Sequence, residues 1–194
     1  MSGVFITGSA DGLGQMAARL LVDAGHQVVL HARSAARAEQ ALRAVPQAQA
    51  ALIDKPQRLV YLSSGLHRSG DASLDDLAWE RRPWQGTGAY SDSKLHDALL
   101  AFAIARRWPG VLSNALEPGW VATKMGGAGA PDDLQAAPKT QVWLAVSDEP
   151  AATVSGAYFY HMKPRETHPA LHDVAVQERL IQACEVFSGI RLPD

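Results

Sequence analysis

The chain has 194 residues, of which 47% are hydrophobic, and it carries a formal net charge of −2 with a pI near 6.4. It lacks the basic excess that is typical of proteins that bind nucleic acid or membrane surfaces, and no apolar run is long enough to span a membrane. A single cysteine, Cys184, excludes an internal disulfide and a cysteine metal cluster. We expect one domain with a sizeable core, a cytoplasmic location, and neither a nucleic-acid nor a membrane partner.

Predicted strands and helices alternate along the chain. The strands fall at about 3–7, 27–31, 58–62, 110–116 and 156–160, and the helices at about 12–24, 34–44, 88–107, 137–147 and 171–187. This alternation predicts a doubly wound, three-layer α/β/α fold of the Rossmann type with a parallel sheet. The first strand begins so close to Met1 that we expect no targeting segment before it, and Cys184 fits the apolar pattern of the last helix as a small core residue.

The first predicted strand runs straight into a glycine-rich turn and then a helix. The turn reads T-G-S-A-D-G-L-G over residues 7–14. Gly8 allows a sharp turn, Gly12 allows a phosphate to approach the backbone, and Gly14 allows the helix to pack on the strand. Free N–H groups at the start of the helix attract an anion. The turn predicts a dinucleotide diphosphate site, with a purely structural turn as the alternative.

A second motif, Y-x-x-x-K, lies at the start of the long predicted helix. Tyr90 and Lys94 are four residues apart, so they share one helix face and can reach the same site. A free phenol ionises near pH 10, and a neighbouring ammonium favours the phenolate, which brings proton transfer closer to neutral pH. The pair is a candidate acid/base with its supporting cation; a surface Tyr–Lys pair is the alternative.

Two further segments follow predicted strands. Ser63 and Ser64 directly follow one strand, and P-G-W-V-A-T at 118–123 follows another. The loop at 124–138, rich in Gly, Ala, Pro and Asp, looks mobile and should border the same edge of the sheet. Ligands of parallel α/β sheets bind beyond the carboxyl ends of the strands, so both segments are candidates for a binding site. The alternatives are hydroxyls that cap a strand and a Pro-Gly turn without a ligand.

In this order, the four motifs resemble those of the short-chain dehydrogenase/reductase family, and S-S-G-L-H at 63–67 with S-K-L at 93–95 is most similar to its retinol-dehydrogenase-like branch. The resemblance implies an enzyme that interconverts an alcohol and a carbonyl by hydride transfer with a nicotinamide cofactor. It implies that Ser64 binds the substrate oxygen, that Tyr90 is the acid/base, and that Lys94 holds the nicotinamide ribose. It implies cofactor contacts at Thr7, Gly8, Ser9, Asp11, Gly12, Leu13, Gly14, Arg33, Ser34, Tyr90, Lys94, Pro118, Gly119, Val121 and Thr123.

Residues after the second predicted strand bear on the choice of cofactor. Arg33 offers a guanidinium to a ribose 2′-phosphate and Ser34 a hydroxyl, where an NAD site would place a carboxylate. We therefore predict NADP(H) as the preferred cofactor and NAD(H) as the alternative. A solvent-exposed arginine at a helix start would carry no such preference. Asp11, inside the glycine-rich turn, counts mildly against a phosphate there.

The chain departs from the family in its middle. Two βα units are expected between the helix at 34–44 and the strand at 58–62, but the chain passes almost directly from one to the other. A βαβ unit needs about 30 residues or more, so on the order of 50–60 residues are absent, with the junction near residues 50–55. The first strand would then lose a neighbour. Either the strand at 58–62 takes that place, or an unpaired edge is exposed.

The missing units would carry a catalytic-relay Asn and an adenine-contacting Asp, a role for which Asp54 is a candidate. Three explanations are open: a true internal deletion, a sequence that lacks part of the full-length protein, and a shortened relative that binds nucleotide without turnover. We favour the second, because every surviving motif keeps its reactive residues.

Several other residues have a functional and a structural interpretation. Trp79 and Trp84 could form a substrate lid or pack within their own segment, and His67 could line a substrate pocket. An apolar stripe on the helix at 88–107 suggests a homodimer or ordinary core; its residues are Leu95, Leu99, Leu100, Phe102 and Ala103. No metal site is expected, because the three histidines near the C-terminus lie among prolines without a cysteine; they are His161, His168 and His172.

The sequence as a whole favours an NADP(H)-dependent oxidoreductase that acts on a small, lipophilic carbonyl or alcohol. Trp120 and Met125 would add apolar surface for such a substrate. The alternative is a non-catalytic nucleotide-binding or interaction module on the same fold, which the missing middle supports and the intact catalytic motifs oppose.

Overall fold

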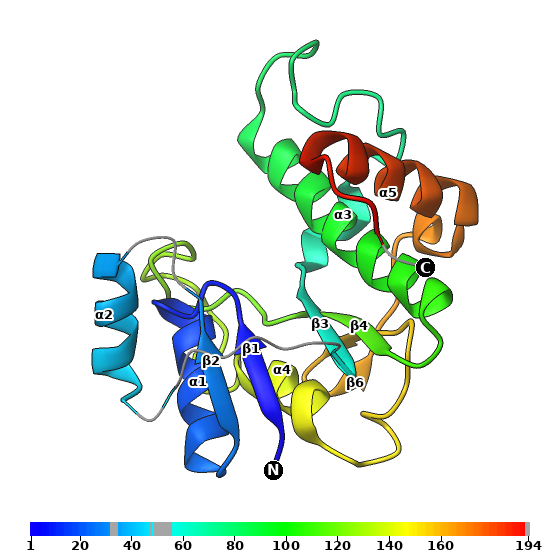
Figure 1. Ribbon diagram of the computed structural model, residues 1–194. Coiled ribbons are helices and arrows are strands. Elements are labelled where there is room, and N and C mark those ends of the chain that lie inside the picture. Colours follow the sequence, from blue (N-terminus) through cyan, green and yellow to red (C-terminus); the bar gives the residue numbers. More distant parts are fainter. Residues whose placement is uncertain (32–34, 47, 49–55, 193–194) are drawn as a thin grey trace.

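The computed structural model describes residues 1–31, 35–46, 48 and 56–192 (Figure 1). Its strands are β1 (Gly3–Ile6), β2 (Gln27–Leu30), β3 (Arg58–Leu62), β4 (Leu112–Glu117), β5 (Tyr158–Tyr160) and β6 (Lys163–Pro164). Its helices are α1 (Gly12–Asp23), α2 (Ala35–Ala44), α3 (Gly86–Arg107), α4 (Lys139–Val146) and α5 (Val174–Ser188), with 3-10 helices at Gly65–Ser69 and Pro169–His172. Every predicted strand and helix is present, although the last predicted helix begins as the second 3-10 helix before α5.

The strands form two separate sheets. β1 pairs with β2 in parallel, and β3, β4 and β5 pair in parallel in that order, with β6 added antiparallel at the end. Among the described residues β1 and β3 do not pair, and Figure 1 shows them as members of two groups of elements. Of the two outcomes expected from the missing units, the second is therefore found: in the part of the chain that the structure describes, β1 and β3 each keep an unpaired edge.

Hydrogen bonds identify the main-chain groups at these unpaired edges. His31 N donates to Ile6 O, so the odd-numbered residues of β1 direct their main-chain groups away from β2. Ser63 N donates to Leu116 O, so the carbonyl of Leu62 points away from β4 in the same manner. Main-chain carbonyls on the unpaired edge of β3 can therefore accept hydrogen bonds from neighbouring donor groups.

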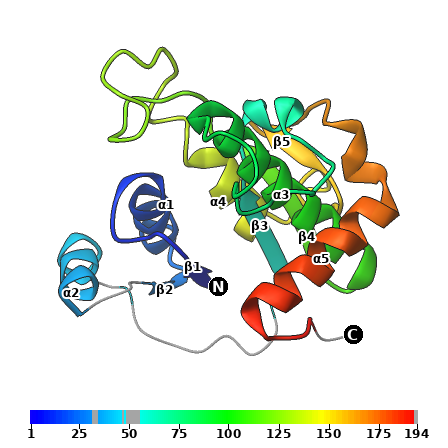
Figure 2. The same cartoon turned by 90° about the horizontal axis from the view of Figure 1, so that it is seen from above.

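Helices cover the sheets on two faces. α3 lies on β3 and β4 with α5 packed against it, while α1 and α4 lie on the opposite face and α2 lies beside β2 (Figures 1 and 2). One core cluster joins α3, α5 and the larger sheet, and a second joins α1, β2 and α4. This arrangement confirms the three-layer α/β/α fold of the Rossmann type with loss of central units.

The apolar stripe of α3 belongs to the core. Leu95 and Leu99 are fully buried and Phe102 is 7% exposed, against α5 and β4. This is the ordinary-core alternative, so the stripe gives no support to a homodimer. Cys184 is exposed, and the expectation that it is a core residue was wrong. The buried face of α5 ends at Ile181, and the last turns of the helix extend past the core.

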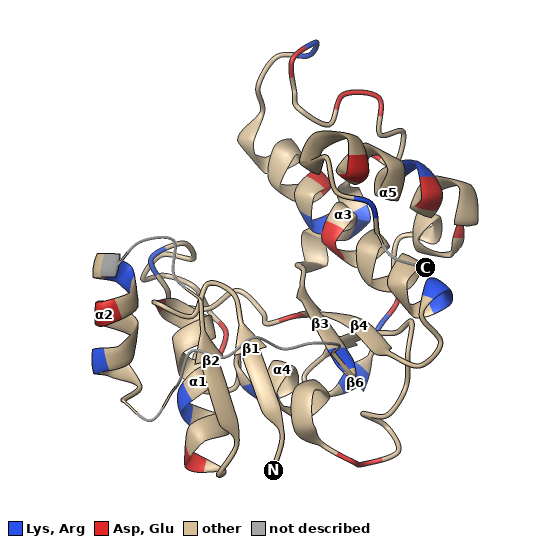
Figure 3. Cartoon of the chain, in the orientation of Figure 1, with Lys and Arg blue, Asp and Glu red and all other residues tan. Residues whose placement is uncertain are grey.

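Charges of both signs are mixed over the surface. Lys and Arg alternate with Asp and Glu on α1, α2, α3 and α5 in the view of Figure 3. None of the helices in the described ranges combines the length and the apolar composition that crossing a bilayer requires.

The segment before α3 is anchored by one arginine. Arg82 stacks its guanidinium 3.8 Å from the ring centre of Trp79, which in turn packs edge-on against Trp84. The same guanidinium pairs with the carboxylates of Asp71, Asp76 and Asp92. Neither tryptophan borders the cavity described below. These contacts favour packing within the segment over a substrate lid.

Candidate active site

A cavity of about 2490 Å³, which we call the central hollow, separates the two sheets. Ligand pockets for small molecules usually measure about 300–1,000 Å³, so the hollow is larger than a single ligand requires. It continues between β1 and β3, because within the described ranges no strand pairs with their facing edges. At the carboxyl ends of the strands it is lined by residues of all four predicted motifs, including Thr7, Gly8, Asp11, Gly12, Leu13, Gly14, Ser64, Tyr90, Lys94, Pro118, Gly119, Val121 and Thr123.

The glycine-rich turn has the backbone that its sequence requires. Gly8 and Gly12 have φ angles of 64° and 55°, in the left-handed region that favours glycine. A Cβ built on Gly14 would lie 2.6 Å from the carbonyl oxygen of Gly8, so α1 packs on the turn as closely as glycine allows. Around Gly12 the space is open within 4 Å of a Cβ, which leaves room for a ligand to approach.

Two side chains of the turn already have partners. Ser9 is buried, and its hydroxyl accepts a hydrogen bond from His31 N at 2.8 Å, which ties the turn to the end of β2. Ser9 does not border the central hollow, so the structure does not bring its side chain to the other candidate residues. Asp11 caps α1 by accepting from Gly12 N at 2.9 Å, and it forms an ion pair with Lys124. The ammonium of Lys124 and the N–H of Gly12 lower the pKa of this carboxyl.

The two serines after β3 have different surroundings. Ser63 is buried and its hydroxyl donates to the carbonyl of Lys94 at 2.7 Å, so this side chain bonds to the backbone. Ser64 borders the central hollow and caps the first 3-10 helix by accepting from Leu66 N at 3.3 Å. Its hydroxyl can still donate to a ligand.

His67 does not line the hollow but supports the Ser64 turn from inside the protein. Its ring is fully buried, with Nδ1 2.8 Å from the carbonyl of Ser64 and Nε2 accepting from His168 N at 3.4 Å. The two partners require Nδ1 to carry the proton and the ring to be neutral. Burial lowers the pKa of His67.

This arrangement predicts a loss of stability in mild acid. In the unfolded chain the His67 ring takes up a proton near pH 6.5, whereas the folded protein resists it until a lower pH. The free energy of unfolding should therefore fall as the pH drops below about 6.5, by at most about 1.4 kcal/mol per pH unit for one proton. Urea unfolding between pH 7.5 and 5.5 measures the slope.

His67→Gln should flatten that slope, and His31→Gln, at an exposed side chain, should leave it unchanged. A half-buried histidine on α3, His96, adds to the same trend, because partial burial also lowers its pKa. An unchanged slope in His67→Gln would show that the ring does not resist protonation.

Tyr90 and Lys94 share the face of α3 that borders the hollow. The Lys94 ammonium lies 5.9 Å from the centre of the Tyr90 ring. It donates to the carbonyl of Leu62 at 3.0 Å and to the Asp97 carboxylate at 2.7 Å. The Leu62 carbonyl is one of the acceptors on the unpaired edge of β3, so Lys94 satisfies a group that a neighbouring strand would otherwise bind.

The segment after β4 forms another wall of the hollow. Gly119 has a φ of 90°, and Val121 is 4% exposed. The Thr123 hydroxyl accepts from Gly126 N at 3.1 Å and keeps its own proton available for a ligand. The 124–138 loop lies beside this wall, where the Asp132 carboxylate accepts from Trp120 N at 2.6 Å.

Sequence reasoning missed a buried acid at this wall. Glu117 ends β4, is 5% exposed and pairs with Arg165 at 2.6 Å. Burial raises the pKa of Glu117, and the guanidinium of Arg165 opposes that rise. A charged residue at the end of a buried strand and directly before Pro118 was the signal that could have identified it. The Arg165 partner follows β6, which the sequence did not predict.

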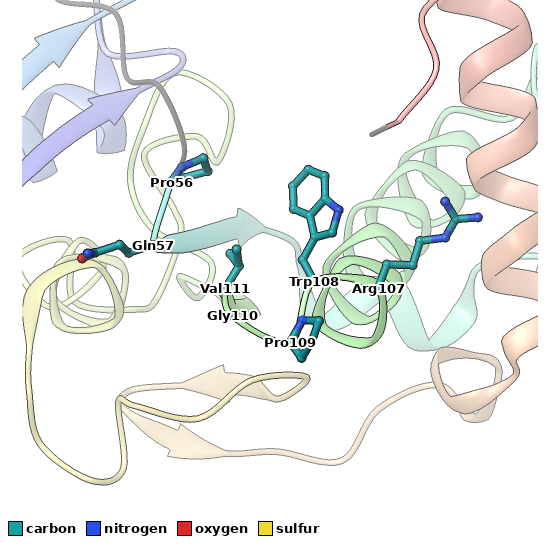
Figure 4. A pocket seen from close by; sticks show the side chains of 7 residues that line it. All are labelled: Pro56, Gln57, Arg107, Trp108, Pro109, Gly110 and Val111. Carbon is teal, nitrogen blue, oxygen red and sulfur yellow. The ribbon is translucent and has the colours of Figure 1, made fainter. Parts of the chain in front are cut away.

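Some predicted residues cannot be placed. Arg33, Ser34 and Asp54, together with the junction near 50–55, lie outside the described residues. Within the described part of the chain, no three His, Cys, Asp or Glu side chains are grouped as metal ligands would be. A second, smaller cavity lies at the opposite ends of β3 and β4, beside Pro56 and Trp108, and none of the predicted site residues that the structure describes borders it (Figure 4).

Comparison with known proteins decides the family. Residues 2–55 match the family described as short chain dehydrogenase. An uncharacterized oxidoreductase of Emericella nidulans is 32% identical over 257 aligned positions, which cover 98% of this chain and 98% of that protein. The chain belongs to the short-chain dehydrogenase/reductase family. Because the alignment is longer than the 194 residues of this family member, many positions of the relative have no counterpart in it.

Other members of the family are similar to this one. A short-chain dehydrogenase of Penicillium rubens is 32% identical and covers all of both chains. Human retinol dehydrogenase 13 is 32% identical over 73% of this chain and 50% of its own length, which confirms a likeness to retinol dehydrogenases. The crystal structure of an uncharacterized protein from Mycobacterium Paratuberculosis has a TM-score of 0.77 at 20% identity, covering 99% of this chain and 95% of that one, and supports the fold.

Proposed function

We propose that this short-chain dehydrogenase/reductase interconverts a carbonyl and an alcohol with NADP(H), with Tyr90 as the acid/base. The observation that carries the proposal is that Ser64, Tyr90 and Lys94 border the same hollow as the glycine-rich turn, although the turn and Tyr90 are far apart in sequence. A catalytic triad beside a diphosphate-type turn has the parts that hydride transfer at a bound nicotinamide requires.

The residues present fit a nicotinamide dinucleotide. The first turn of α1 borders the hollow, and free N–H groups at a helix N-terminus favour an anion. Gly12 leaves open space beside the turn, and Thr123 keeps a donor on another wall. Thr7, Gly8, Leu13, Gly14, Pro118, Gly119 and Val121 would complete the cofactor contacts, with the Val121 backbone toward the carboxamide. Ser9 would contribute its main chain only, because its hydroxyl is bonded to β2.

When bound, the nicotinamide supplies or accepts the hydride. In the reductive direction Ser64 and Tyr90 donate hydrogen bonds to the carbonyl oxygen, which polarises the carbon toward hydride. The Tyr90 O–H then gives its proton to the developing alkoxide. Lys94 would hold the nicotinamide ribose, and its positive charge would favour the phenolate that remains after the transfer.

The cofactor preference rests on Arg33 and Ser34, whose groups suit a 2′-phosphate. A related Shigella flexneri protein, 16% identical with a TM-score of 0.60, was solved as a complex with NADP, which is a property of that protein. We expect a lipophilic substrate because Trp120 and Met125 border the hollow with large exposed apolar surfaces. A cytoplasmic location and a homodimer remain expectations from the sequence.

A non-catalytic nucleotide-binding module is the second candidate function, and the unpaired edges of β1 and β3 favour it. Fluorescence titration with NADPH, NADP, NADH and NAD tests binding, with Trp120 in the hollow as a reporter. A panel of aldehydes and ketones followed at 340 nm tests turnover. NADPH binding with carbonyl-dependent oxidation supports the enzyme, binding without turnover supports the module, and the absence of both contradicts the two proposals together.

The ion pair between Asp11 and Lys124 gives a prediction about cofactor affinity. Asn caps helices as well as Asp does, so Asp11→Asn keeps the cap and removes a negative charge from the proposed diphosphate site. We expect NADPH to bind about three- to tenfold more tightly at low salt, with a smaller difference at 0.5 M NaCl. Lys124→Gln should instead weaken NADPH binding, because it removes a positive charge from the same site. Weaker binding in Asp11→Asn would show that the carboxylate does not oppose the phosphates.

A further inference from the structure

The carboxylate of Asp97 is placed to act on the catalytic pair, although no motif includes it. Asp97 follows Lys94 by three residues and borders the central hollow. Its Oδ2 atom accepts from the Lys94 ammonium at 2.7 Å, and the two side chains are 37% and 24% exposed. An ammonium has three N–H donors. Asp97 and the Leu62 carbonyl take two of them, which leaves one for a ligand in the hollow.

The negative charge of Asp97 reaches the phenol of Tyr61. Tyr61 of β3 borders the same hollow, and its pKa is raised first by burial and then by the Asp97 carboxylate. A nearby carboxylate raises the pKa of a phenol, because its negative charge disfavours the phenolate. Lys94 favours the phenolate of Tyr90 in the proposed mechanism, so a carboxylate bonded to that ammonium must offset part of its influence.

Other charged side chains around the hollow form ion pairs that do not include Lys94 or Asp97. Glu117 pairs with Arg165, and Lys124 pairs with Asp11. The other ionisable groups that the structure describes at this end of the hollow are Tyr61, Arg68, Asp132 and Tyr160. Among the described residues, Lys94 forms one ion pair, with Asp97.

We infer that Asp97 is a positioning residue of the reaction: it holds the Lys94 ammonium against β3 and moderates its charge, and so sets the pH at which Tyr90 changes protonation state. The inference rests on the proposed function, because it assumes that Tyr90 and Lys94 are the catalytic pair.

Ultraviolet titration of tyrosinate tests the inference without turnover. The chain has four tyrosines, so the Tyr90 signal is isolated as the difference between the parent and Tyr90→Phe, and between Asp97→Asn and Asp97→Asn/Tyr90→Phe. We expect the midpoint of the Tyr90 signal to move about 0.5–1 pH unit lower in Asp97→Asn, because an opposing charge is removed while a hydrogen-bond acceptor is retained. Asp97→Glu, which keeps the charge, should remain near the parent.

Activity gives an independent measurement. In the enzyme, the pH profile of kcat/KM should move in the same direction in Asp97→Asn as the absorbance midpoint. An unmoved midpoint in Asp97→Asn, or an equal shift in Asp97→Glu, overturns the inference even if stability or kcat has fallen. If no carbonyl is reduced by the parent, the proposed function fails, whereas a shifted midpoint still shows that Asp97 acts on Tyr90.

Discussion

Replacing Tyr90 with Phe should lower carbonyl reduction by about 10²–10⁴-fold, the range that general acid catalysis contributes. The substitution removes the proton donor and retains the ring, which borders the central hollow from the first turns of α3. NADPH affinity should change by about twofold or less, because Lys94 and the glycine-rich turn are untouched. Steady-state kinetics at 340 nm and fluorescence titration measure the two quantities separately.

Tyr160 provides the matched control for this substitution. It is a second phenol that borders the same hollow, from the end of β5, and Arg165 stacks on its ring at 4.8 Å. Tyr160→Phe should retain turnover within about threefold, since its hydroxyl has no role in the proton transfer. Comparable losses in the two variants would assign the effect to the hollow as a whole. Full activity in Tyr90→Phe would remove Tyr90 from the mechanism.

The fold could be predicted largely from local pattern. Short apolar runs bounded by glycine or proline gave β1, β2 and β3, and apolar residues at helical spacing gave α1 and α3. The separation of the two sheets is a different matter. A sequence shows that a strand is missing, but whether β1 and β3 then close against each other depends on the packing of α1, α4 and α3, which no local pattern contains.

The candidate site was predictable where its residues are sequence neighbours. The i,i+4 spacing placed Tyr90 and Lys94 on one face, and the same rule extended by three residues would have identified Asp97. His67, three residues after Ser64, also had a local signal. The pairing of Asp11 with Lys124 and of Glu117 with Arg165 had no local signal, because these partners are brought together by the tertiary fold.

Gly14→Ala should disable nucleotide binding and destabilise the protein. The new Cβ would lie 2.6 Å from the Gly8 oxygen and 3.0 Å from the Gly8 carbonyl carbon, and these are backbone atoms that no side-chain rotation can move. The turn and α1 must separate, which costs about 1–3 kcal/mol by comparison with other overpacked sites. We expect a lower urea midpoint and a loss of NADPH binding of at least about tenfold, because the separated N–H groups no longer converge on one anion.

Gly3→Ala controls for the loss of a glycine in the same βα unit. Gly3 lies on β1, outside the left-handed region, and a Cβ there would meet nothing within 4 Å. Alanine should therefore leave the urea midpoint and the NADPH affinity close to those of the parent, or raise stability slightly by restricting the unfolded chain. The contrast between two Gly→Ala changes in one strand–turn–helix unit separates the close approach at Gly14 from a general sensitivity of the N-terminal unit. If NADPH binds equally well to the parent, Gly3→Ala and Gly14→Ala, the glycine-rich turn is not the diphosphate site. The proposed cofactor site is then wrong, even if Tyr90 proves to be essential for turnover.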